Sequence, residues 1–167
     1  MQGQSGSTPK SKSPPGPLDR IDRQILRILQ KKGRITIAEL AKVVHLTTTP
    51  CYERVKRLER EGFIRGYAAL VDPKRLGLSL LVFVEVRVDR TTPDIMGKFQ
   101  AAVQRFNEVV ECHMVAGGFD YLIKIRVADM EAYRRFLSAN LASMPGVKQT
   151  RTYIVMEEVK CSSEVAA

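Results

Sequence analysis

The sequence predicts an α+β fold in two parts, a helical N-terminal part and a C-terminal part in which strands and helices alternate. Apolar residues recur at helical spacing through residues 19–61, whereas from Tyr67 onward they also follow the two-residue period of strands. Positive charge divides the chain at the same place, since the formal charge is +2 over residues 1–17, +6 over 18–66 and +1 over 67–167. These changes indicate a basic module joined to a near-neutral one.

Two helices are predicted at the start of the basic module, each with a capping signal. The first begins at Asp19, whose carboxylate can cap the first turn, and ends at Gly33 after two lysines. The second opens on a capping box formed by Thr36 and Glu39. Each carries an apolar stripe, formed by Ile21, Ile25, Ile28 and Leu29 in the first and by Ile37, Leu40, Ala41 and Val44 in the second.

A third helix follows a tight corner at His45-Leu46, with Thr47 as its cap and Pro50 in its first turn. Its apolar residues Cys51, Val55 and Leu58 lie within about 60° of one another and form a buried stripe. Gly62 ends the helix, and residues 63–67 are predicted to form a short strand and turn with the shape of a wing. Residues 18–66 are therefore predicted to be a winged helix-turn-helix domain.

The polar side of the third helix indicates its function. A short basic helix held across a second helix can enter a DNA major groove. An alternative is that its charges form a solvated face, paired with Glu53 and Glu61. The tight corner and the local excess of positive charge favour double-stranded DNA as the partner. The predicted DNA-binding residues are Thr47, Thr48, Thr49, Pro50, Tyr52, Glu53, Lys56, Arg57 and Arg60.

The second part of the chain has the element order β-α-β-β-α-β, which is typical of a ferredoxin-like fold. The predicted elements are a strand at 80–88, a helix at 93–106, strands at 109–115 and 121–127, a helix at 129–141 and a long strand at 147–159. Gly117-Gly118 forms the turn between the middle strands, and Pro145-Gly146 breaks the last helix.

One face of the predicted sheet has no helix to cover it. Leu81 and Phe83 alternate there with Glu85 and Arg87, and an open face with this much apolar surface usually meets a partner. Self-association through this face would give a dimer with two recognition helices, suited to a twofold-symmetric DNA site.

Other classes of protein find little support in the sequence. The three cysteines are odd in number and widely spaced, so neither a disulfide framework nor a metal site is expected. With only two histidines and no nucleophile beside a base, no enzyme is expected. No membrane span or signal peptide is predicted, which favours a cytoplasmic protein. The predicted boundaries are a disordered tail at 1–17, a linker at 67–78, a ligand-sensing and oligomerisation domain at 79–160 and a tail at 161–167.

Long segments of the chain resemble the Lrp/AsnC (feast/famine) family of transcription regulators over residues 18–160. The segments include LDRIDRQIL at 18–26, TPCYERVKRLEREGFIRGY at 49–67 and ECHMVAGGFDYLIKIRVADMEAYR at 111–134. The resemblance implies a nucleoid-associated regulator of amino-acid metabolism that needs no cofactor. It also implies dimers that assemble into octamers, and a free amino acid, leucine or another small or branched one, bound between dimers.

The resemblance also implies where the amino acid binds. Its residues would be Met114, Gly117, Gly118, Asp120, Tyr121, Met130, Tyr153, Ile154 and Val155. Backbone N–H groups of the glycine turn could bind the carboxylate and Asp120 the ammonium group. Family members often carry Gly-Asp in this turn, whereas this chain has Gly117-Gly118 and so lacks one carboxylate. The alternatives are a simple hairpin turn with core methionines, and an architectural DNA-binding protein without a ligand.

Overall fold

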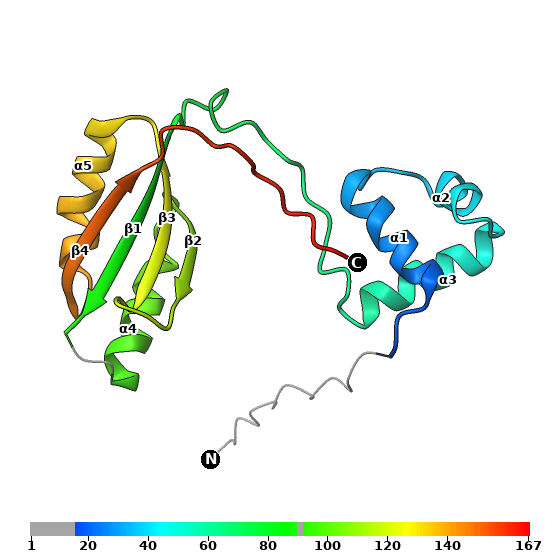
Figure 1. Ribbon diagram of the computed structural model, residues 1–167, viewed down its shortest axis with the longest axis horizontal. Helices are drawn as coiled ribbons and strands as arrows, with labels where there is room; N and C mark the ends of the chain where they lie inside the picture. The colour runs from blue at the N-terminus through cyan, green and yellow to red at the C-terminus, as the bar shows by residue number, and fades with distance from the viewer. Residues whose placement is uncertain (1–15, 90–91) are drawn as a thin grey trace, which may run out of the picture. The chain divides into compact units, whose positions relative to one another are not determined.

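The computed structural model describes residues 16–89 and 92–167 (Figure 1). Most of the predicted disordered tail, residues 1–15, lies outside this range. The described chain forms two compact units, the first running to Leu70 and including Cys161–Ala167, the second comprising Val71–Lys160. Within the described residues, no helix is long and apolar enough to cross a membrane.

Three helices make up the first unit: α1 (Arg20–Lys31), α2 (Ile37–Val43) and α3 (Thr48–Arg60). Both predicted capping signals are confirmed, because Asp19 and Asp22 form a capping box on α1 and Thr36 and Glu39 form one on α2. Thr47 stands at the start of α3 as predicted, but its side chain makes no capping hydrogen bond. The corner before α3 turns at His45, which has a φ of 56°.

The apolar stripes of these helices meet in one core, formed by Ile25, Leu40, Ala41, Val44, Cys51, Val55 and Leu58. Phe63 and Ile64 pack against it after the chain turns at Gly62, which has a φ of 81°. The short strand predicted at residues 63–67 is absent. Instead, the Ile64 N–H donates to the carbonyl of Leu58 at 3.1 Å, so the segment closes the end of α3 and does not pair with another strand.

The capping box of α2 gives the first unit a defined response to acid. Hydrogen bonds from Thr36, first from its backbone N–H and then from its hydroxyl, hold the pKa of Glu39 below its ordinary value of 4.5. A lowered pKa stabilises the fold above pH 4.5, and this stability is lost as the pH falls through the folded-state pKa. We expect Glu39→Gln to lower the urea midpoint at pH 7, and to lower it by a smaller amount at pH 3. An equal difference at both pH values would contradict this role for the charge.

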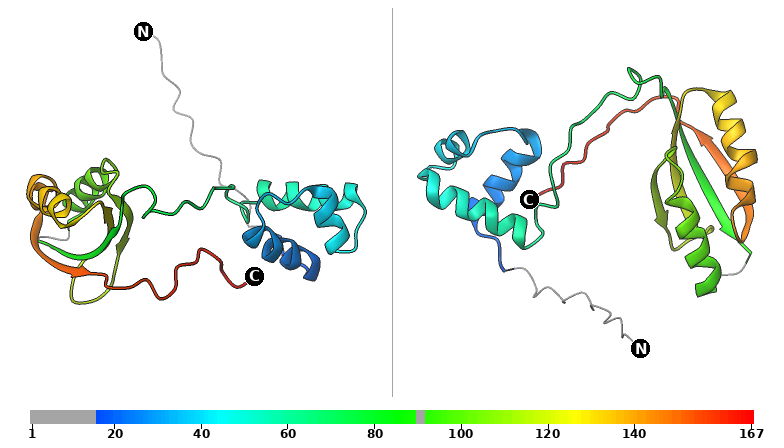
Figure 2. Two further views of the ribbon diagram at one scale, coloured as in Figure 1. Left: turned by 90° about the horizontal axis from the view of Figure 1, so that it is seen from above. Right: turned by 180° about the vertical axis from the view of Figure 1, so that it is seen from behind.

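The second unit is a four-stranded antiparallel sheet in the order β2-β3-β1-β4. Its strands are β1 (Leu80–Val88), β2 (Val109–Met114), β3 (Tyr121–Val127) and β4 (Val147–Ile154). The helices α4 (Pro93–Val103) and α5 (Met130–Ala139) lie on the same side of the sheet (Figure 2), followed after α5 by the short 3-10 helix η1 (Leu141–Ser143). The predicted ferredoxin-like fold is confirmed.

The last strand is shorter than predicted. β4 pairs only with β1, and Ile154 lies opposite Val82, close to where β1 begins. Beyond Ile154 there is almost no β1 left to pair with, so β4 ends there and not at Val159. The chain that follows still contacts the sheet, since Glu158 Oε1 lies 2.7 Å from Arg126 Nη2.

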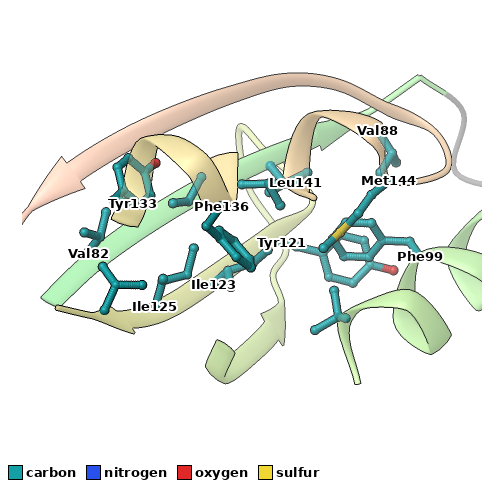
Figure 3. Close-up of a cluster of buried hydrophobic side chains, with 14 residues drawn as sticks. Val82, Val88, Phe99, Tyr121, Ile123, Ile125, Tyr133, Phe136, Leu141 and Met144 are labelled. Carbon is teal, nitrogen blue, oxygen red and sulfur yellow. The ribbon is translucent and has the colours of Figure 1, made fainter. Parts of the chain in front are cut away.

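The core of the second unit lies between the sheet and the two helices (Figure 3). Alternate residues of β1 and β3 point into it, with side chains from α4, α5 and η1 packed above them. The buried side chains include Val82, Val84, Val86, Phe99, Tyr121, Ile123, Ile125, Tyr133, Phe136 and Leu141. The sheet therefore keeps its other face free of helices.

The turn at Gly146 requires glycine for two separate reasons. Its φ is 76°, and a Cβ placed there would lie 2.3 Å from Ile95 Cγ2. Gly77 has nearly the same φ, 75°, with nothing within 4 Å, so Gly77→Ala isolates the backbone cost of about 1–2 kcal/mol. We expect Gly146→Ala to cost about 1–3 kcal/mol more in urea unfolding, because Ile95 must move. Equal losses would mean that Ile95 yields freely.

Candidate DNA-binding and effector sites

One side of α3 is exposed and polar. It carries six of the predicted DNA-binding residues, Thr48, Thr49, Tyr52, Glu53, Lys56 and Arg60, while Thr47 and Pro50 are exposed at its leading end. The Lys56 ammonium lies 5.6 Å from the centre of the Tyr52 ring and 2.9 Å from Glu59 Oε2. Its hydrogen bond to Glu59 raises the pKa of Lys56. This exposed stripe combines positive charge, hydroxyl groups and an aromatic ring, as a DNA-reading surface requires.

Arg57 does not lie on that stripe, contrary to the sequence prediction. Its guanidinium pairs with the carboxylate of Asp22, which is completely buried. Arg54 reaches the same carboxylate at 2.9 Å and also contacts Asp19. The helical wheel placed Arg57 opposite the apolar stripe, but α1 lies along that flank of α3 and supplies the acid. Sequence reasoning missed Asp22 and Arg54, for which the available signal was an acid at the third position of an amphipathic helix.

The predicted effector turn is held to the sheet by Asp120. Its carboxylate accepts a hydrogen bond from the Val88 N–H at 2.8 Å, and its own N–H donates to the Val86 carbonyl at 3.0 Å. Gly117 and Gly118 are exposed, and the Gly118 carbonyl accepts from Arg87. One oxygen of Asp120 therefore has a structural partner, while the glycine N–H groups stand at the surface of the turn.

Tyr121 is placed differently from the prediction. Its side chain is 1% exposed and belongs to the core, where its ring lies 4.4 Å from that of Phe99. Because strand residues alternate between faces, Tyr121 points to the same side as Ile123 and Ile125. It can support the turn, but its ring is not offered to a ligand at the surface.

The remaining predicted effector residues fall into two groups that are far apart. Met114 is paired with Tyr121, at the turn end of edge strand β2. Ile154 lies on the opposite edge strand, β4. It pairs with Val82 of β1, which in turn pairs with Ile125 of β3. Met114 and Ile154 are separated by about 13 Å along the strands and about 14 Å across them. Tyr153 and Val155 are the neighbours of Ile154 in the chain. Met130 begins α5 just after β3 ends at Val127, which is the end of β3 nearer to Ile154.

A small polar pocket lies beside the turn, on the face of the sheet that carries no helix. Its volume is about 70 Å³, and its lining includes Glu85, Arg87, Gln149, Thr150, Arg151, Gly118 and Phe119. Sites for small molecules usually enclose about 300–1,000 Å³. The pocket offers both signs of charge, as a zwitterion needs, but one chain encloses too little space for a complete site. Arg87 and Arg151 line this pocket but were not among the residues predicted from the sequence, although both alternate onto this face.

No group of three or more His, Cys, Asp or Glu side chains that could hold a metal occurs in the part of the chain that the structure describes. The three cysteines are free, with Cys51 buried, Cys112 half-buried and Cys161 exposed. Burial raises the pKa of the Cys51 and Cys112 thiols, so neither is poised as a thiolate.

Comparison with known proteins identifies both units. Residues 18–65 match the family model for winged helix-turn-helix DNA-binding, and residues 81–165 match that for the Lrp/AsnC ligand binding domain. The chain is 58% identical to the leucine-responsive regulatory proteins of Salmonella typhimurium and Escherichia coli over 156 residues, covering 93% of this chain and 95% of each relative.

Solved structures agree with this assignment. A transcriptional regulator from Neisseria meningitidis, in complex with L-Met, superposes with a TM-score of 0.85 at 36% identity, covering 89% of this chain and 96% of that chain. An AsnC family regulator from Agrobacterium tumefaciens gives the same values. The relatives are regulators and not enzymes, as the sequence predicted. The chain therefore belongs to the Lrp/AsnC family and is a DNA-binding transcription regulator modulated by a ligand.

Proposed function

We propose that the chain is a cytoplasmic, nucleoid-associated regulator of amino-acid metabolism whose effector is a free amino acid bound between copies of the chain. Residues 18–66 would bind DNA through the exposed stripe of α3, and residues 67–78 would link this domain to a sensing and oligomerisation domain at 79–160. Residues 1–17 and 161–167 would be tails. The observation that carries the effector proposal is the separation of the two groups of site residues on the sheet.

That separation favours a site built from two chains. A single residue advances an extended chain by only about 3.8 Å, so one free amino acid cannot touch both Met114 and Ile154 of the same copy. The turn of one copy and the β4 end of another can meet at an interface, and the small pocket beside the turn would then be closed by the second chain. The glycine N–H groups would take the carboxylate and the methionines the side chain.

Leucine is the effector proposed first. It is the amino acid in the names of the 58% identical relatives, while L-Met is bound in the structural relative. Leucine has a branched and methionine an unbranched side chain, and both are apolar, so either could pack against Met114, Met130 and Ile154. Dimers formed through the helix-free sheet face, assembled further into octamers, would supply the required interfaces.

A thermal-shift screen of the twenty amino acids tests the effector. At a concentration 100-fold above the dissociation constant, the true effector should add about 2.7 kcal/mol of stability. We expect leucine or methionine to stabilise the protein and acidic amino acids to leave it unchanged. No stabilisation by any amino acid would favour an architectural DNA-binding protein instead.

Mixing two inactive variants tests whether each site spans two chains. Gly118→Val blocks the turn, and Ile154→Asp blocks the β4 end. Each variant alone should lose effector binding. In a freely exchanged equimolar mixture, about a quarter of the sites would combine an intact turn with an intact β4 end. Calorimetry should then recover that fraction of the binding stoichiometry, whereas a site contained in one chain would recover none.

A further inference from the structure

Asp22 is the one buried charged residue among residues 16–89 and 92–167. It lies in the first turn of α1, and its carboxylate receives three donors. Oδ1 accepts from Arg54 Nη1 at 2.9 Å, and Oδ2 accepts from Arg57 and from the Asp19 N–H at 3.1 Å. A buried carboxylate is tolerated only with such complete pairing.

The two arginines both come from α3, at positions three residues apart. They occupy the flank between the buried stripe of Cys51, Val55 and Leu58 and the exposed stripe. Apolar packing between α1 and α3 is non-directional and would tolerate some rotation of α3 about its axis. Charge-assisted hydrogen bonds to a guanidinium are directional. A single carboxylate that holds both arginines therefore fixes the rotation of α3 on α1.

The same contacts remove these arginines from the charge available to DNA. Arg54 contacts Asp19 and Asp22, and Arg57 contacts Asp22. The four side chains form a neutral cluster of two acids and two bases. The hydrogen bonds raise the pKa of both guanidinium groups, with Asp19 the largest cause for Arg54 and Asp22 for Arg57.

We infer that Asp22 is a positioning residue for DNA recognition: it sets the angle at which α3 presents its exposed stripe, and Arg57 acts through Asp22 and not as an independent DNA contact. The inference rests on the proposed use of that stripe to read DNA. The residues of the exposed stripe would then contact DNA, while Asp22 and Arg57 orient the helix that carries them.

The test compares sequence-specific with non-specific affinity. A duplex selected by the unsubstituted protein from a random pool and a scrambled duplex of the same composition are titrated at several salt concentrations. Asp22→Asn keeps the shape and removes the charge. We expect affinity for the selected duplex to fall about 10- to 100-fold and affinity for the scrambled duplex to change less than about threefold. Base readout depends on the orientation of α3, whereas attraction to phosphates depends on charge.

Asp94→Asn is the matched control, because Asp94 is also in the first turn of a helix and is paired with a basic residue, Lys98 at 2.9 Å. It should change neither affinity. Equal proportional losses on both duplexes with Asp22→Asn would overturn the inference, since they would report a loss of folded protein. Failure of the unsubstituted protein to select any sequence would instead refute the proposed function.

Arg57→Lys keeps the inference testable if Asp22→Asn does not fold. Lysine keeps the charge but cannot reproduce the fork of a guanidinium. We expect the selected duplex to lose affinity while the salt slope stays the same. A slope lowered by about one in Arg57→Ala would mean that Arg57 neutralises a phosphate directly, which would overturn the inference.

Discussion

Replacing Phe83 by Asp should convert the protein into a monomer and weaken its binding to a two-half-site DNA duplex by on the order of 100-fold or more, because two linked heads bind far more tightly than one. Phe83 lies on the helix-free face of the sheet, opposite Tyr153 on β4 and Lys124 on β3. In a face-to-face dimer, the new carboxylate would be buried without a partner.

Aspartate suits this test because the monomer can tolerate it. Lys124, directly across from position 83, already pairs with Glu111 at 2.9 Å, so it does not provide a partner for a new carboxylate in the dimer, whereas in a separate copy that carboxylate stays exposed to water. Sedimentation velocity gives the oligomeric state, and circular dichroism checks the fold. Ser138→Asp, which adds the same charge to an exposed position of α5, should keep the oligomeric state of the unsubstituted protein. A Phe83→Asp protein that stayed dimeric would place the interface elsewhere.

Removing Lys56 and Arg60 together should reduce the dependence of DNA binding on salt. Both are exposed on α3, and each phosphate contact contributes about 0.9 to the slope of log K against log salt concentration. The double alanine variant should lower the slope by about two per recognition helix and weaken binding by about 10- to 100-fold at low salt.

A matched pair on the second unit gives the control for this measurement. Lys98 and Arg135 are exposed and pair with Asp94 and Glu131 on their own helices. Their double alanine variant changes the net charge by the same amount but should leave the slope unchanged. If both double variants shifted the slope equally, general electrostatic attraction and not the stripe of α3 would explain DNA binding.

The sequence predicted most of the secondary structure because the signals were local. The capping boxes of α1 and α2 lie within four residues each, and the alternation in β1 and β3 is uninterrupted. The end of β4 was misjudged because it depends on its pairing with β1, more than sixty residues earlier in the chain. The missing strand after Gly62 has the same cause, since apolar residues there pack onto a helical core and have no strand to pair with.

Two of the predicted site residues, Arg57 and Tyr121, point elsewhere than the sequence indicated. A helical wheel gives the angle of Arg57 on α3, but it cannot show that Asp22 of α1 lies next to that side of the helix and pairs with Arg57. Tyr121 is a different case, because its alternation with Ile123 and Ile125 already pointed to the core. A motif match identifies a position along the chain, whereas the alternation of side chains along a strand decides which face of the sheet the ring lies on.

The wide separation of Met114 and Ile154 on the sheet has a consequence for how a cell would use this regulator. On the proposal that the effector site is built from two chains, the site exists only where copies have met, so its occupancy follows both the amino-acid pool and the abundance of the protein itself. Raising the expression of the gene would lower the amino-acid level at which the response begins. The threshold is then set by protein synthesis as well as by binding chemistry, and the cell can retune it without changing a residue.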